Sequence, residues 1–240
     1  PIIWKKLHIH YADRDTLINH ELGENEPLSL KKTVTIPVDA PYSQPYWLRH
    51  EDTGTMYVIP DQSLSGKPES PPALTATYTM QIAGKTIDFA VPVQFRETDP
   101  VRGAVYEPFH ITPQLSLSVD HPGYVFPDTT SRLIRVQIEN LGPESDGDLV
   151  PVLPEGWKIS PRSNRFRLAE GVSREYTFKV TPLNDAANGS LTFEARTPDR
   201  TYNHELIRIA YAHIAPQSVM QPARTRLIPL DISIESRSIG

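Results

Sequence analysis

The sequence predicts an all-β protein made of two tandem immunoglobulin-like, or fibronectin III-like, β-sandwiches. Short segments along the whole chain alternate between apolar and polar residues, with the period of two that is typical of half-buried strands. Turn signals separate these segments, and no stretch longer than two turns has the period of a helix. The 24 prolines are scattered, which indicates many strand ends and loops.

The clearest strands of the first half form a hairpin around Ala83-Gly84. One face of the outgoing strand carries Leu74, Ala76, Tyr78, Met80 and Ile82, and the returning strand carries Ile87, Phe89, Val91, Val93 and Phe95. Two more strands are expected before the hairpin, at residues 2–10 and at residues 33–38. The second of these alternates strictly between valine or isoleucine and other residues. Together they predict a first sandwich over residues 1–110, truncated at its N-terminus.

A proline-rich stretch at residues 96–113 predicts a short, stiff connector between the two domains. The alternating pattern then restarts and continues to residue 211, which predicts an immunoglobulin-like sandwich over residues 111–215. Residues 216–240 are expected to be a linker followed by one more strand, at residues 227–234. That strand fits either an addition to the second sandwich or the start of a further domain. Because Pro1 is not a start residue, we expect the chain to be a processed or excised piece.

Composition restricts the classes of partner and site. The formal net charge is −5 and no basic patch occurs, which argues against a nucleic-acid partner. No apolar run approaches the roughly 20 residues that a membrane-spanning helix needs. The chain has no cysteine, so disulfides, thiolate metal sites and cysteine nucleophiles are excluded.

Three aromatic residues, Tyr42, Tyr46 and Trp47, are the candidate binding residues. They lie within a stretch of unusual aromatic and proline density at residues 39–49. Aromatic rings can stack on the apolar face of a sugar, so this group is a candidate glycan platform. The alternative is that one or two of them fill the core, because strand alternation would put Tyr46 on the face opposite Trp47.

His8 and His10 are candidate metal ligands, because they are two apart on an expected strand and so point the same way. Asp13 or His20 would complete a metal site. The simpler interpretation is a pair of polar residues on a solvent-facing side, because spacing fixes no third ligand. The sequence also lacks a Gly-x-Ser-x-Gly nucleophile motif and a phosphate-binding glycine loop. We therefore expect no metal, no cofactor and no catalytic residue in this chain.

One stretch, TIPVDAPYSQPYWL at residues 35–48, resembles a segment of the large secreted PIG-L (LmbE-like) deacetylases of Bacteroidetes-type bacteria. Four later stretches are similar to the same region of those enzymes: DQ at 61–62, PPALTA at 71–76, TDPVRG at 98–103 and HIAPQ at 213–217. Separately, PEGWKISP at 154–161 and YTFKVTP at 176–182 resemble the α-galactosidase-associated sandwich domain.

The resemblance implies a parent zinc-dependent hydrolase that removes acetyl groups from N-acetylglucosamine-type sugars. Its zinc would be held by a catalytic domain outside this chain, whose motif is His-Pro-Asp-Asp. Here His121-Pro122 is followed by glycine and tyrosine, so both carboxylates are missing and a turn is expected. The chain would thus be a non-catalytic accessory or spacer region, periplasmic or extracellular, with other domains of the parent chain and a glycan as partners. The alternatives are a carbohydrate-binding module and an adhesion or assembly protein.

Overall fold

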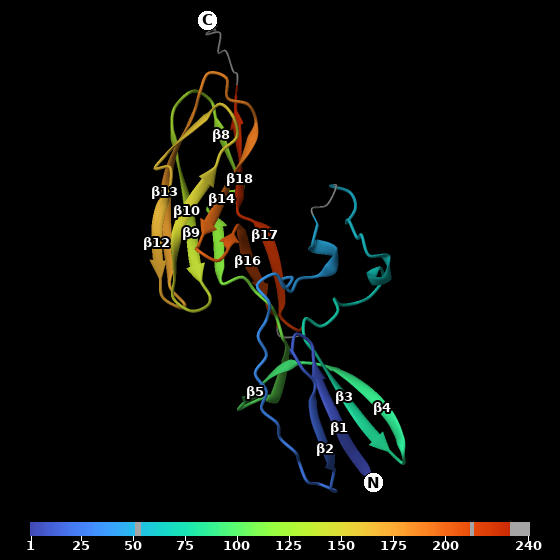
Figure 1. Ribbon diagram of the computed structural model, residues 1–240. Helices are drawn as coiled ribbons and strands as arrows, with labels where there is room; N and C mark the ends of the chain where they lie inside the picture. Colours follow the sequence, from blue (N-terminus) through green and yellow to red (C-terminus); the bar gives the residue numbers. More distant parts are fainter. Residues whose placement is uncertain (51–53, 212–213, 231–240) are drawn as a thin grey trace, which may run out of the picture. The chain divides into compact units, whose positions relative to one another are not determined.

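The computed structural model describes residues 1–50, 54–211 and 214–230 (Figure 1). Strands make up nearly all of the regular structure. The helices of the described part are two short 3-10 turns, η1 (Tyr46–Leu48) and η2 (Gln62–Leu64). No helix in these ranges is long and apolar enough to cross a membrane. The all-β class expected from the sequence is therefore confirmed.

The chain divides into two compact units. The first comprises Pro1–Thr112 with Arg208–Val219, and the second comprises Pro113–Ile207 with the segment that starts at Met220. Strands β16 (His204–Ile209) and β17 (Gln217–Pro222) pair with each other, and a boundary between the units falls inside each of them.

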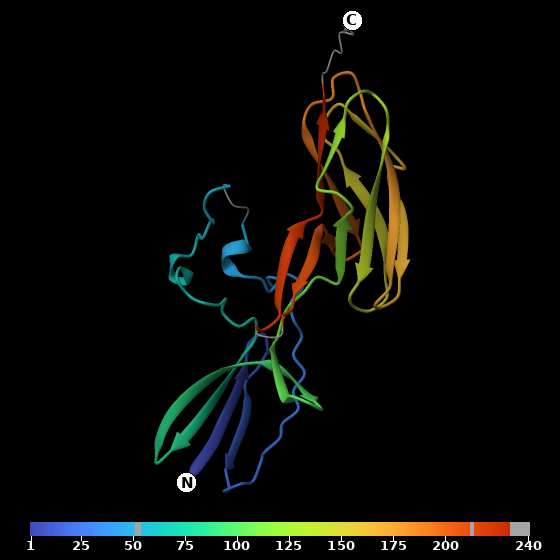
Figure 2. The same ribbon diagram turned by 180° about the vertical axis from the view of Figure 1, so that it is seen from behind.

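The first unit contains an antiparallel four-stranded sheet in the order β2-β1-β3-β4. Its members are β1 (Ile2–Ile9), β2 (Thr16–Glu21), β3 (Thr75–Ile82) and β4 (Lys85–Pro92), and β4 forms one edge (Figures 1 and 2). The buried side chains on this sheet are Trp4, Leu7 and Ala76, with Tyr78 and Met80 partly buried beside them. This core is small because only part of one face of the sheet is covered.

The predicted hairpin is confirmed in its turn and in most of both strands, but the returning strand ends at Pro92, so Val93 lies in no strand and Phe95 lies in β5. Ala83 has a φ of 49° and Gly84 a φ of 81°, so both turn residues adopt the left-handed conformation that a two-residue hairpin turn requires. Tyr78 lies opposite Phe89, and Met80 opposite Ile87. Paired residues project to the same face, so the apolar alternation of the two strands is in register.

The expected connector at residues 96–113 is wrong for most of its length. Residues 94–108 form a hairpin of β5 (Gln94–Asp99) and β6 (Gly103–Pro108). At the turn, Asp99 Oδ1 accepts hydrogen bonds from the backbone N–H of Val101 at 2.8 Å and of Arg102 at 2.7 Å. An aspartate that binds its following amides, with proline next in sequence, is turn chemistry rather than linker chemistry.

The expected strand at residues 33–38 is also wrong, because these residues are in no strand. Val34 and Ile36 are half-buried, but Val38 is 76% exposed. Pro37 has no backbone N–H to donate, which removes a ladder hydrogen bond from the middle of the run. The alternation is present in the sequence, but these residues pair with no described strand.

The second unit is a β-sandwich. One sheet has the order β12-β10-β14-β18-β8, with β15 paired to β14, and the other has the order β11-β13-β9-β7 (Figures 1 and 2). The strands are β7 (Leu115–Val119), β8 (Gly123–Phe126), β9 (Arg132–Asn140), β10 (Ser145–Val152), β11 (Trp157–Ser160), β12 (Asn164–Leu168), β13 (Ser173–Pro182), β14 (Gly189–Arg196), β15 (Thr201–Tyr202) and β18 (Arg224–Pro229). A single core between the sheets contains side chains that are completely buried, among them Ile134, Phe178, Phe193 and Leu227.

The tail strand lies inside this sandwich. β18 pairs antiparallel with β14 and parallel with β8, and Leu227 and Thr225 are completely buried. The sequence left open whether this strand belongs to the second sandwich, and residues 224–229 are a central strand of its sheet. The expected continuation at residues 231–234 lies outside the described residues. The expected linker before it contains β17, and β8 is a further strand that the sequence pattern did not indicate.

Candidate functional site

The first unit contains a cavity of about 340 Å³, and all of its lining residues belong to that unit. Its walls come from several separate parts of the chain: His10 and Tyr11, residues 41–44, Arg49, Asp61, Leu64, residues 69–73, residues 108–111 and residues 217–218. Most of these segments lack regular structure, so hydrogen bonds outside the sheets must hold them in place.

Serine hydroxyls hold the wall formed by residues 41–44 and the adjoining Tyr46 backbone in place. Ser43 donates its backbone N–H to the carbonyl of Ile111 and accepts the Ile111 N–H on its side chain, both at 2.8 Å. Ser70 Oγ donates to the carbonyl of Gln44 at 3.0 Å and accepts from the N–H of Tyr46 at 2.8 Å. These bonds join parts of the chain that are far apart in sequence, and they form a polar frame on which Tyr42 is presented to the cavity.

His110 and Ser218 form the polar contact on another wall. His110 Nδ1 lies 2.8 Å from Ser218 Oγ, and Ser218 is only 4% exposed. Burial, and then the nearby Arg208 guanidinium, lower the pKa of His110 below its usual value. The imidazole is therefore neutral at pH 7 and offers one donor and one acceptor nitrogen.

Aromatic and charged groups complete the cavity. The rings of His10 and Tyr11 are stacked with centroids 4.0 Å apart. Arg49, Asp61 and Glu69 add charged side chains to the lining. Asp61 is committed to its turn, because it accepts the N–H of Ser63 at 2.9 Å, and hydrogen bonds from Ser63 hold the pKa of Asp61 below its usual value. The site thus combines hydroxyl, amide, imidazole and aromatic groups.

The structure separates the three aromatic residues of the candidate platform. Tyr42 is half-buried and lines the cavity. Tyr46 is 6% exposed, and its hydroxyl donates to the carbonyl of Lys67 at 3.1 Å. Trp47 is half-buried, does not line the cavity, and meets the Tyr46 ring edge-on, at an interplanar angle of 88°. The three rings form no common flat surface, and only Tyr42 contributes to the cavity.

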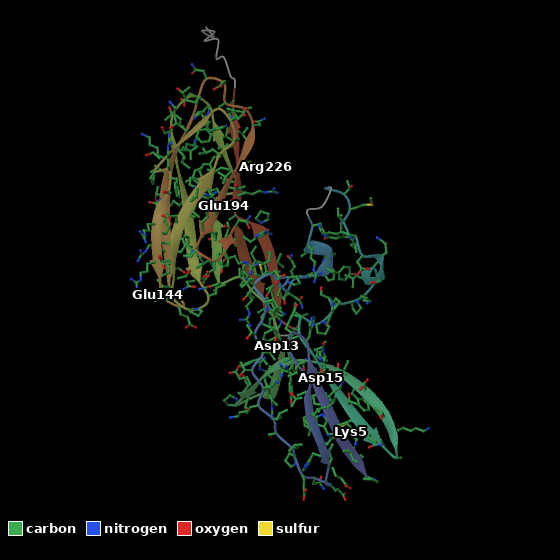
Figure 3. The ribbon with its side chains drawn as sticks, viewed as in Figure 1. Lys5, Asp13, Asp15, Glu144, Glu194 and Arg226 are labelled. Atoms are coloured by element: carbon green, nitrogen blue, oxygen red, sulfur yellow. The ribbon has the colours of Figure 1, made fainter. Side chains whose placement is uncertain are left out.

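His8 and His10, the pair of candidate metal ligands, both have other partners. His8 Nδ1 is 2.8 Å from Asp15 Oδ1, and Lys6 Nζ is 2.7 Å from Asp15 Oδ2. Asp13 and Asp15 both lie in the connection between β1 and β2 (Figure 3). His10 packs on Tyr11 instead. Within the described ranges, no three His, Asp or Glu side chains are grouped so that they could hold a metal ion.

Sequence reasoning did not find Ser43, Ser70, His110 or Ser218 as parts of a site. Single serines and histidines in loops carry no periodic signal, and their grouping depends on contacts between segments up to 108 residues apart. The aromatic and proline density at residues 39–49 was the usable signal, and it located one wall of the cavity.

Comparison with known proteins gives no family. No protein-family model matches the chain, and no curated protein matches it.

Proposed function

We propose that this chain is a non-catalytic accessory region that binds a carbohydrate through the cavity of its first unit. In this proposal it belongs to a PIG-L-like deacetylase of the periplasm or cell exterior and helps to position that enzyme on its glycan. In this proposal the second unit is a sandwich of immunoglobulin-like or fibronectin III-like type, and the two units separate the other domains of the parent chain.

One observation carries the proposal. Four of the five stretches that resemble the deacetylases contribute to the wall of a single cavity: residues 41–44, Asp61, residues 71–73 and Gln217. These stretches are far apart in the sequence, and only folding brings them together. A resemblance that reflected sheet packing alone would be distributed over the strands of the unit instead.

The chemistry of the lining suits a neutral sugar. A pyranose presents hydroxyl groups at its rim, for which the cavity offers Ser, Gln and a neutral His110, and a ring face, for which it offers Tyr42. The cavity is within the range of about 300–1,000 Å³ that small-molecule sites occupy. An acetamido sugar adds an amide, which both serine and glutamine side chains can bind.

Calorimetric titration with N-acetylglucosamine oligosaccharides tests the binding role. Tyr42→Ala is expected to weaken binding at least about tenfold, since a buried aromatic contact and its area are lost. Tyr57→Ala is the matched control, because Tyr57 is 59% exposed and does not line the cavity. Equal affinities for Tyr42→Ala and the unmodified chain would refute the site. Release of acetate from such sugars by the purified chain with added zinc would refute the non-catalytic role.

A further inference from the structure

Strand β4 exposes an apolar row on the edge of the first unit's sheet. Ile87 is 42% exposed, and Phe89 and Val91 are each 45% exposed. The register places them opposite Met80, Tyr78 and Ala76 of β3, so they extend the apolar face on which Trp4 and Leu7 are buried. A row of large apolar side chains that continues a buried face is typical of an interaction surface.

The rest of this face is partly covered by the chain itself. Residues 22–30 contribute Leu22, Leu28 and Leu30 to an open groove of about 870 Å³ together with Trp4, Tyr78 and Met80. None of the side chains of β4 takes part in that groove. The cover therefore reaches β1 and β3 but not the row on β4.

The backbone of β4 is also open on its outer side. Among the described strands, β4 pairs only with β3. Its two-residue turn makes Ile82 and Lys85 a hydrogen-bonded pair, so the peptide groups of residues 85, 87, 89 and 91 face β3. Those of Thr86, Asp88 and Ala90 face outward. An edge with such free groups is a template for another strand.

We propose that β4 pairs antiparallel with β4 of a second copy of this chain, with Phe89 opposite Phe89 at the two-fold axis. In this register Ile87 faces Val91 of the other copy, and Asp88 faces Ala90. The apolar row then meets itself across the axis, and the outward peptide groups of Asp88 and Ala90 bond to each other. This inference does not depend on the proposed carbohydrate function.

Neighbouring registers are less favourable. Centring the pair on Asp88 puts two carboxylates directly opposite each other, which is destabilising. Centring it on Ala90 leaves one complete hydrogen-bonded pair, Ala90 with Ala90, because Asp88 then lies opposite Pro92, which has no N–H to donate. The proposed register has two complete pairs of Asp88 with Ala90, and Pro92 lies opposite Thr86 at the ends of the ladder. Asp88 is in addition engaged on the polar face of its own sheet, where it accepts the Thr79 hydroxyl at 2.6 Å. Asp88 is the one charged residue among residues 86–91, and in the proposed register it lies opposite Ala90 rather than a second carboxylate.

Light scattering after size exclusion tests the pairing on the whole chain over a wide range of concentrations. The unmodified chain is expected to be a dimer. Ala90→Pro removes an outward N–H and leaves the β3 ladder intact, and Phe89→Lys places two cations opposite each other. Each is expected to weaken dimerisation at least about tenfold without lowering the β content measured by circular dichroism.

A crosslink tests the register itself. The chain has no cysteine, so Phe89→Cys can form a disulfide only with a second copy. A directly opposed, non-hydrogen-bonded pair has a Cα separation that a disulfide accepts. Mild oxidation is expected to link Phe89→Cys and not the control Val101→Cys, whose residue is 93% exposed on the β5–β6 turn. A monomer at all concentrations, or a dimer that survives both Ala90→Pro and Phe89→Lys, would overturn the proposal. Pairing of β4 with a strand of a different protein would not rescue it, because the proposed partner is a second copy of this chain.

Discussion

Trp4 and Leu7 lie three residues apart on β1, yet both are buried on the same face of the sheet. Strict alternation would send them to opposite faces. The register explains the difference, because Trp4 lies opposite Met80 while Lys6 lies opposite Thr79, which leaves Lys5 as an extra residue. Lys5, labelled in Figure 3, is thus the bulge that brings the two apolar side chains together.

Trp4→Ala is expected to lower the free energy of unfolding of the first unit by about 3 kcal/mol. The Trp4 ring is 6% exposed and 5.4 Å from the Tyr78 ring, and it is the largest side chain of a small core. Hydrogen exchange measured by mass spectrometry, segment by segment, would report the loss in β1 and β3. Leu17→Ala is the control, because Leu17 is 76% exposed on β2 and should change stability by less than about 0.5 kcal/mol. Similar losses for the two variants would show that this core does not stabilise the unit.

Sequence periodicity was a sufficient guide where a sheet has one buried face and regular pairing. In β9, Ile134, Val136 and Ile138 are completely buried and the residues between them are exposed, as the alternation predicted. The alternation was a poor guide where a strand contains a bulge or where an alternating segment pairs with no other strand. A bulge breaks the alternation between Trp4 and Leu7, and residues 33–38, which alternate and contain Pro37, pair with no described strand.

The candidate site was less accessible to sequence reasoning than the fold. Tyr42 could be proposed because its neighbourhood is rich in aromatics, but Tyr46 and Trp47 are used for local packing. The contact of His110 with Ser218 joins residues 108 positions apart, and no local pattern encodes such a pairing. Loop sites of this kind depend on the whole fold that positions them.

Asn140 is expected to be one of the most sensitive polar positions of the second unit. It is completely buried, and its Nδ2 donates to the carbonyls of Pro143 and Leu168, each at 2.9 Å. Asn140→Leu keeps roughly the same volume but removes both of these hydrogen bonds and the one that Asn140 Oδ1 accepts from the Gly142 N–H, so the free energy of unfolding should fall by about 2 kcal/mol or more. The Pro143 carbonyl keeps the hydrogen bond that Gln114 Nε2 donates at 2.8 Å. Urea unfolding measures this loss. Gln137→Leu, at an exposed position of the same strand, should have little effect, and an equal loss there would contradict the role of the buried amide.

Gly147 and Gly123 differ in the space that surrounds them. A Cβ at Gly147 would lie 2.2 Å from the carbonyl oxygen of Arg196 and 3.0 Å from Phe166 Cζ, whereas at Gly123 the nearest atoms are 3.7 Å away. Gly147→Ala should therefore lower the free energy of unfolding by about 1–3 kcal/mol, because neighbouring strands must move apart. Gly123→Ala should leave it unchanged or raise it by up to about 1 kcal/mol, since alanine restricts the unfolded chain. Thermal unfolding of both variants decides the point, and the reverse order of stability would contradict it.

Tyr124 makes the stability of the second unit depend on alkaline pH. Its hydroxyl donates to Asp120 Oδ1 at 2.6 Å, and burial, followed by this hydrogen bond, raises the pKa of the phenol well above its usual value. In the unfolded chain the phenol ionises near pH 10, whereas the folded chain keeps its proton. The stabilisation is therefore complete below about pH 10 and is lost as pH rises from there toward the raised pKa of the folded state.

Urea unfolding between about pH 8 and pH 11 measures this dependence. Trp157 reports on the second unit alone once Trp4 and Trp47 are replaced by phenylalanine, because the chain has three tryptophans. Tyr124→Phe should lower the free energy of unfolding by about 1–2 kcal/mol at pH 8, because the hydrogen bond to a carboxylate is lost. Above about pH 10 the free energy of unfolding of this variant should fall less steeply with pH than that of the unmodified chain. Some fall should remain, since burial also raises the pKa of Tyr202. Asp120→Asn should flatten the curve in the same direction, because a neutral acceptor opposes ionisation of the phenol less than a carboxylate does. If the free energy of unfolding fell as steeply above about pH 10 in Tyr124→Phe as in the unmodified chain, the loss of stability at alkaline pH would come from other groups than Tyr124.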